Sequence, residues 1–176
     1  ILTAAHCFDD GRGNVTNFDA SGGLSAMPLN GSQVLFYAGG NLATDANYPT
    51  KDIDYAVQRC VMGAFANSGQ ICISVQRIYL HHAIVNEFTE KYIEATQRLK
   101  VDHPLVKDSD VGPMISASEV KRVHDWVREA VNDGATLLTG GQPVNERIFP
   151  PTILTNVKPD MKVSCEEVFA PVVVLE

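Results

Sequence analysis

Residues 52–80 read DIDYAVQRCVMGAFANSGQICISVQRIYL, a stretch in which a helical pattern gives way to a run of β-branched residues. Apolar side chains recur at helical spacing from Ile53 to Phe65, and two aspartates stand at the start of this pattern. This spacing predicts a helix that stops near Ser68-Gly69, since acidic residues favour a helix N-terminus and glycine favours its end. Residues 71–80 are rich in β-branched side chains and predict a strand.

The alternation of helix and strand continues downstream. Residues 83–99 form an amphipathic pattern that predicts a helix. A further helix is expected from a cap at Ser116 or Ser118 to about Asn132. Residues 135–138 and 172–175 predict strands. Strands that alternate with helices indicate an α/β fold with a mainly parallel sheet flanked by helices.

Residues 1–34 differ from the rest of the chain. They are rich in Gly, Asn, Ser and Asp and show no sustained helical period, which predicts short strands joined by loops or partial disorder. We therefore expect two parts, an irregular N-terminal segment over 1–34 and a domain over 35–176. The sequence starts at Ile1 without a Met, so we expect a fragment, a processed product or an incomplete chain.

Composition excludes several classes of protein. The 176 residues carry a formal net charge of −7 without a basic stripe, which argues against nucleic acid as a partner. No apolar run approaches the roughly 18 residues that cross a bilayer, and no signal peptide is recognisable, so we expect no membrane partner and a cytoplasmic location.

The four cysteines show no spacing typical of metal ligands, and we expect no metal site. Cys60 falls on the apolar side of its helix and is expected in the core. His81 and His82 are adjacent at the end of a strand, but no further ligands converge on them. Isolated thiols in a reducing compartment fit this pattern.

Cys72 has the local setting that a nucleophile requires. It follows Gly69-Gln70 at a junction of helix and strand, where glycine allows a ligand close to the backbone and free amides could stabilise an oxyanion. Many free cysteines are simply small buried apolar residues, so local physics alone leaves both interpretations open.

The segment Phe65-Ala-Asn-Ser-Gly-Gln-Ile-Cys72 resembles the cysteine signature of aldehyde dehydrogenases, in which Phe, Gly, Gln and Cys keep a fixed spacing. The resemblance extends from about Gly39 to Glu176. Further segments match the family in order and spacing: Ile73–His81, Asp110-Val-Gly-Pro-Met114, Gly134–Gly141, Pro150-Pro-Thr-Ile-Leu154 and Glu166-Glu-Val-Phe-Ala-Pro171.

The resemblance implies a partial aldehyde dehydrogenase catalytic domain and its chemistry. Cys72 would attack a small-molecule aldehyde, hydride would pass to NAD or NADP, and hydrolysis of the thioester would release an acid. Glu167 matches the glutamate that holds the nicotinamide ribose, and Phe169 matches the aromatic residue beside the nicotinamide. The resemblance also implies a homo-oligomer for the full-length family.

Two segments depart from the family pattern. Tyr37 stands where the family carries the general-base glutamate, and a tyrosine with a pKa near 10 is a poor base at neutral pH. Hydrolysis is therefore expected to be impaired, and a non-catalytic α/β domain that serves in assembly or interaction is the alternative.

Leu2-Thr-Ala-Ala-His-Cys7 resembles the histidine motif of trypsin-like serine proteases. No other part of a serine triad is recognisable, so we interpret this motif as chimeric or coincidental.

Overall fold

The computed structural model describes residues 53–176 with their side chains and residues 15–18, 24–27 and 35–38 as backbone. Strands β1 (Val15–Phe18) and β2 (Leu24–Met27) form an antiparallel pair. The main sheet has five strands in the order β3-β4-β7-β6-β5. The protease-like motif at residues 2–7 lies outside the described residues.

The main sheet is mixed but mostly parallel, as the sequence predicts. Its strands are β3 (Leu35–Ala38), β4 (Arg77–Leu80), β5 (Thr136–Thr139), β6 (Thr152–Thr155) and β7 (Val172–Leu175). In this sheet β3 pairs with β4, β4 with β7 and β7 with β6, all in parallel. Only the pair of β6 and β5 is antiparallel. The strand that comes last in sequence, β7, lies between β4 and β6 in the middle of the sheet.

The helix predicted to stop near Ser68-Gly69 is confirmed as α1 (Ile53–Phe65), which ends a few residues earlier, and a short 3₁₀ turn, η2 (Ala66–Gly69), covers the remaining residues. The strand predicted for residues 71–80 is confirmed only for Arg77–Leu80. Residues 74 and 75 instead fold back on the helix. The Ser74 hydroxyl donates to the Ala64 carbonyl at 3.1 Å, and the Val75 N–H donates to the Gly63 carbonyl at 3.0 Å. These bonds satisfy the free carbonyls at the end of α1, which a strand would leave unpaired.

The other helices are α2 (Val85–Gln97), α3 (Ala117–Asn132) and the short α4 (Lys162–Cys165). Ser116 is the residue that caps α3, because its hydroxyl accepts the Glu119 N–H at 3.2 Å. Gly134 follows the end of α3 with a φ of 108°, a conformation that glycine adopts easily.

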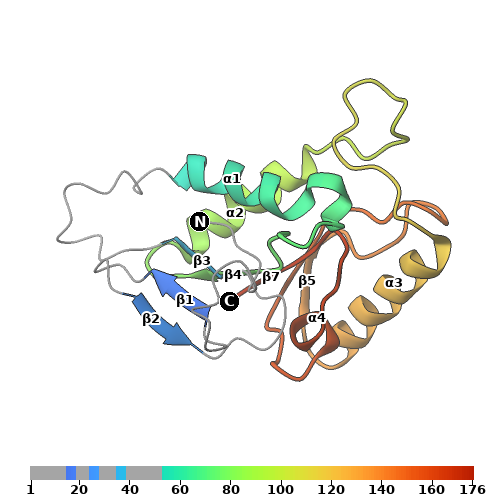
Figure 1. Ribbon diagram of the computed structural model, residues 1–176. Helices are drawn as coiled ribbons and strands as arrows, with labels where there is room; N and C mark the ends of the chain where they lie inside the picture. The colour runs from blue at the N-terminus through green and yellow to red at the C-terminus, as the bar shows by residue number, and fades with distance from the viewer. Residues whose placement is uncertain (1–14, 19–23, 28–34, 39–52) are drawn as a thin grey trace.

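The helices cover both faces of the sheet (Figure 1). Val173 and Leu175 of β7 pack into a core with α1 and α2, whereas Val172 and Val174 pack into a second core with α3 and α4. This division follows from the two-residue period of a strand, which sends neighbouring side chains to opposite faces. The result is an α/β domain in three layers, with a central strand that is buried on both sides.

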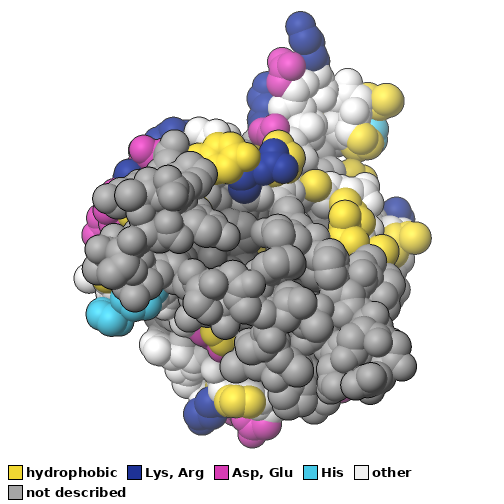
Figure 2. All heavy atoms as spheres, turned by 60° about the vertical axis from the view of Figure 1, so that its left-hand side comes forward, with side chains coloured by type: hydrophobic (Ala, Val, Ile, Leu, Met, Phe, Trp, Pro, Cys, Tyr) yellow, Lys and Arg dark blue, Asp and Glu magenta, His cyan; other side chains and the backbone are white. Residues whose placement is uncertain are grey.

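The segment between α2 and α3 projects from this body (Figure 2). A parallel bridge between Val101 and Val111 closes its base, and Leu105 is 88% exposed. The Asp110 carboxylate in this segment accepts the Lys100 N–H at 2.8 Å. Over the described residues, no helix combines the length and the apolar character that a bilayer span requires.

Candidate active site

The chain makes an unusual left-handed turn directly after α1. Asn67, Ser68 and Gly69 have φ values of 50°, 57° and 67°, a region that residues with a Cβ rarely adopt. The turn is closed locally: the Gln70 N–H donates to the Asn67 carbonyl at 3.1 Å, and the Asn67 side chain donates to the Gln70 carbonyl at 3.2 Å.

Gly69 brings two distant segments into contact. A Cβ built on Gly69 would lie 2.2 Å from the carbonyl oxygen of Ala170 and 2.9 Å from the nitrogen of Pro171. Only a residue without a side chain allows this approach. The cysteine signature and the segment Glu166–Pro171, which the sequence connects only through a family resemblance, are therefore packed backbone to backbone.

Two polar side chains anchor the cysteine loop to a third segment. The Ser68 hydroxyl donates to the Gly112 carbonyl at 2.9 Å, and the Gln70 side-chain oxygen accepts the Ile115 N–H at 2.9 Å. The segment 110–114, which also matches the family, and the adjoining Ile115 thus lie against the cysteine loop. Sequence reasoning did not assign these roles to Ser68 and Gln70, although both belong to the quoted signature.

Cys72 and Cys60 lie in opposite environments. Cys72 is exposed in the turn that leads toward β4. Cys60 is completely buried, as its place on the helix predicts, and burial raises the pKa of its thiol from 9.0 to about 12. A buried thiol of this kind stays protonated at neutral pH, so Cys60 is not suited to nucleophilic attack.

Cys165 is also a free thiol. It is exposed at the end of α4, and its sulfur lies 3.5 Å from the Asp160 carbonyl oxygen. Exposure alone therefore does not distinguish Cys72. What distinguishes Cys72 is the loop that carries it, which is fixed to two other segments of the chain.

The carboxylate of Glu167 and the ring of Phe169 both belong to exposed residues. Phe169 is 40% exposed and so does not belong to the apolar core. Its φ of 49° is also unusual for an aromatic residue, and such strain concentrates at functional sites. An exposed carboxylate and an exposed aromatic ring beside the cysteine loop are groups that can hold a ribose and a flat heterocycle.

Tyr37 belongs to β3, the neighbour of β4 in the main sheet. In the backbone register of β3 and β4, Tyr37 pairs with Tyr79, the third residue of β4, whereas Cys72 precedes that strand. The neighbouring Gly39-Gly40 lies outside the described residues.

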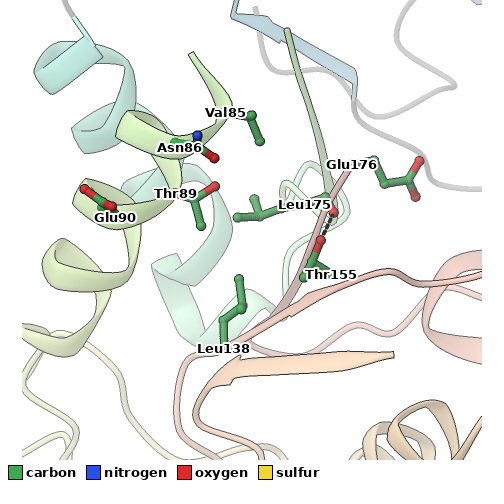
Figure 3. Close-up of a pocket in the computed structure, with 8 residues that line it drawn as sticks. All are labelled: Val85, Asn86, Thr89, Glu90, Leu138, Thr155, Leu175 and Glu176. Atoms are coloured by element: carbon green, nitrogen blue, oxygen red, sulfur yellow. Dashed lines mark hydrogen bonds between the residues drawn. The ribbon is translucent and has the colours of Figure 1, made fainter. Parts of the chain in front are cut away.

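A cavity of about 430 Å³ opens between α2 and the strands β5, β6 and β7. Figure 3 shows Thr89, Leu138 and Leu175 directed toward one another across this space, whereas the Glu176 carboxylate points away from it. That carboxylate pairs with Arg77 at 2.7 Å. None of the three candidate residues lines the cavity, so this cavity and the candidate site are separate places.

The adjacent imidazole rings of His81 and His82 have centroids 4.1 Å apart, and both residues are exposed. In the part of the chain that the structure describes, no group of three or more His, Cys, Asp or Glu side chains could hold a metal ion. The pair of histidines therefore has no further ligand among these residues.

Comparisons with known proteins agree with the arrangement of these segments. A 3-sulfolactaldehyde dehydrogenase of Priestia aryabhattai is 43% identical over 136 residues, which are 77% of this chain and 28% of that protein. A structure of aldehyde dehydrogenase 21 from Physcomitrella patens, solved with the reaction product succinate, superposes with a TM-score of 0.70 at 40% identity, over 73% of this chain and 27% of that one.

A glyceraldehyde-3-phosphate dehydrogenase from Methanocaldococcus jannaschii, solved with NADP, gives a TM-score of 0.67 at 36% identity over 70% of this chain and 27% of that one. This chain thus spans little more than a quarter of the length of these proteins. The sequence pattern of the aldehyde dehydrogenase family matches residues 32–176. The chain belongs to the aldehyde dehydrogenase family.

Proposed function

We propose that this chain carries the nucleophile and part of the cofactor site of an NAD(P)-dependent aldehyde dehydrogenase that oxidises an aldehyde to a carboxylic acid. One observation carries this proposal: Gly69 packs against the backbone of Ala170 and Pro171, so the loop of Cys72 adjoins the loop of Glu167 and Phe169. A nucleophile and a cofactor site must be neighbours for hydride transfer to occur.

In the proposed reaction, the Cys72 thiolate forms a bond from sulfur to the aldehyde carbon, and the carbonyl oxygen becomes the alkoxide of a thiohemiacetal. The alkoxide re-forms its carbonyl as the carbon loses a hydride, which leaves a thioester on Cys72. Water then cleaves the bond between sulfur and carbon, releasing the acid and restoring the thiol. Peptide N–H groups near the turn could stabilise the alkoxide.

Nicotinamide dinucleotide, when bound, supplies the hydride acceptor. The Glu167 carboxylate would accept hydrogen bonds from the ribose hydroxyls, and the Phe169 ring would lie against the nicotinamide. The relatives support either form of the cofactor, since the Methanocaldococcus jannaschii structure contains NADP and a betaine aldehyde dehydrogenase from Staphylococcus aureus, 29% identical, was solved with NAD+.

Residues 35–176 would form part of the catalytic domain, and residues 1–34 a separate segment. We also propose that the whole protein is cytoplasmic and assembles as a homo-oligomer, in line with the family resemblance.

The test is an aldehyde-dependent rise in absorbance from the reduced nicotinamide. Succinate semialdehyde and 3-sulfolactaldehyde are suitable first substrates, because relatives are named for them. Cys72→Ser should lower turnover on the order of 10³-fold or more. The matched control is Cys165→Ser, which replaces another exposed thiol and should retain activity. Equal activity in the wild type and Cys72→Ser would show that Cys72 is not the nucleophile.

A second candidate function is a non-catalytic domain that serves in assembly. The observation that favours it is Tyr37, which stands at the family's general-base position. If the chain is an aldehyde dehydrogenase, the wild type should give one rapid burst of reduced cofactor and then turn over slowly. The acyl group should be detectable on Cys72 by mass spectrometry. Tyr37→Glu should then raise the steady rate. Neither a burst nor acylation, together with no binding of NAD or NADP, would leave only the assembly function.

A further inference from the structure

The loop between Glu166 and Pro171 has a conformation that needs support. Phe169 holds a left-handed φ of 49°, and an aromatic residue does not adopt this conformation without help from its surroundings. The peptide group that precedes Phe169 contains the carbonyl of Val168. A contact that fixes that carbonyl therefore fixes the peptide plane on one side of the φ torsion of Phe169.

Arg122 of helix α3 fixes that carbonyl. Its guanidinium donates to the Val168 oxygen at 2.7 Å, across 46 residues of sequence. A bond from a charged donor is shorter and stronger than a bond between neutral groups, and this one is only partly exposed to solvent.

The guanidinium of Arg122 is itself held from two further sides. Its Nε donates to the Glu119 carboxylate at 2.9 Å, and its central carbon lies 4.5 Å from the centre of the Trp126 ring. Both partners belong to α3, one turn before and one turn after Arg122. The side chain thus has little freedom to leave the Val168 carbonyl, because the planar group is paired at one edge and stacked on one face.

We propose that Arg122 is a positioning residue for the cofactor: it holds the peptide between Val168 and Phe169 so that the Phe169 ring and the Glu167 carboxylate face a bound nicotinamide riboside. This inference rests on the proposed function for its ligand, and on the contacts of Arg122 for its geometry. Arg122 touches neither the aldehyde nor Cys72 in this scheme, so its effect should fall on cofactor affinity.

The experiment compares Arg122→Met with Arg122→Lys and with Arg128→Met. Arg128 lies on the same helix and is exposed, and its guanidinium pairs with Asp125 at 3.3 Å. For Arg122→Met we expect a KM for NAD or NADP that is raised about tenfold, with kcat at saturating cofactor and KM for the aldehyde changed less than about twofold. Lysine can donate to the Val168 carbonyl, but it lacks the planar guanidinium that pairs with Glu119 and stacks on Trp126. In Arg122→Lys the KM for the cofactor should therefore rise only about threefold.

Hydrogen exchange of the same variants gives a measurement that does not depend on turnover. Amides of residues 168–172 should exchange faster in Arg122→Met, and should keep the wild-type rate in Arg128→Met. The amides of residues 117–132 in the same experiment report whether α3 remains folded in each variant. If Arg122→Met fails to fold, Glu119→Gln loosens the same guanidinium and should shift both measurements in the same direction.

The outcomes separate the two proposals. Unchanged cofactor KM and unchanged exchange in Arg122→Met would overturn the role of Arg122, even if the wild type oxidises aldehydes. A lower kcat together with similar increases in KM for the cofactor and for the aldehyde would also overturn it, because such changes would indicate general damage to the folded protein. A wild type without turnover or cofactor binding would instead refute the proposed function, and with it the role of Arg122 in holding a cofactor; faster exchange at residues 168–172 would then show only that Arg122 supports the loop.

Discussion

Helix α1 and the loop that follows it are neighbours in sequence, but different forces hold them. The helix buries one apolar face, which includes Val57, Cys60 and Phe65, against α2 and the sheet. The loop has a strained backbone and is held by hydrogen bonds and by a close backbone contact with distant segments. Packing of apolar residues tolerates many sequences, whereas the loop depends on individual atoms. This difference explains why helix α1 contributes mainly to the stability of the fold, whereas the loop can position reactive groups.

Among the substitutions that test this comparison, the largest effect is expected for Gly69→Ala. The new Cβ would meet the Ala170 carbonyl at 2.2 Å, and the left-handed φ would itself cost roughly 1–2 kcal/mol. The two loops must therefore separate, and aldehyde oxidation should fall about 100-fold or more, since small displacements of reacting groups are costly.

Gly112→Ala is the matched control for this change. No atom lies within 4 Å of a Cβ at Gly112, so activity and melting temperature should stay close to the wild type. Similar activity in both variants would contradict the view that the contact at Gly69 builds the site.

Gln70→Ala should have a moderate effect. It removes the acceptor of the Ile115 N–H, a bond of 2.9 Å near the surface, which typically contributes about 0.5–1.5 kcal/mol. We expect kcat/KM to fall by up to about tenfold, with little change in melting temperature. Gln97→Ala removes an exposed glutamine that makes a long 3.4 Å contact with Thr139, and should leave kcat/KM unchanged. Equal effects of the two substitutions would mean that the anchor on Ile115 does not matter.

Cys60→Ala tests the helix side of the comparison, and its effect at neutral pH should be small. Loss of the buried sulfur should reduce the free energy of unfolding by about 1 kcal/mol and leave kcat/KM unchanged. At alkaline pH the two proteins should converge. Folding raises the pKa of Cys60 from 9.0 to about 12, so the unfolded wild type loses its proton first and stability declines between these values.

Chemical denaturation between pH 7 and pH 11 measures this convergence. Burial also holds the pKa of Tyr92 well above its usual value of 10.0, so the alkaline decline should be reduced in Cys60→Ala but not abolished. Parallel pH profiles for the wild type and the variant would show that Cys60 ionises freely in the folded protein.

The same comparison shows what the sequence can predict. The helical period of residues 53–65 and the capping residue Ser116 depend on local patterns, and both predictions are confirmed. The left-handed turn at residues 67–69 and the failure of residues 71–76 to form a strand depend on contacts with Ala170, Gly112 and the end of α1. No local period encodes such contacts. Only the family resemblance connected Cys72 with Glu167 and Phe169, and Arg122 left no sequence signal because a basic residue on a helix is ordinary.

The central place of β7 has a consequence for how the protein reaches its native state. In the described sheet, β4 and β6 are joined only through β7, which is translated after both. During synthesis these two strands therefore have open edges that can pair with other chains. Domains whose pairings connect distant residues also fold slowly, since the chain must close long loops before contacts form. We expect nascent chains stalled before residue 172 to need chaperones.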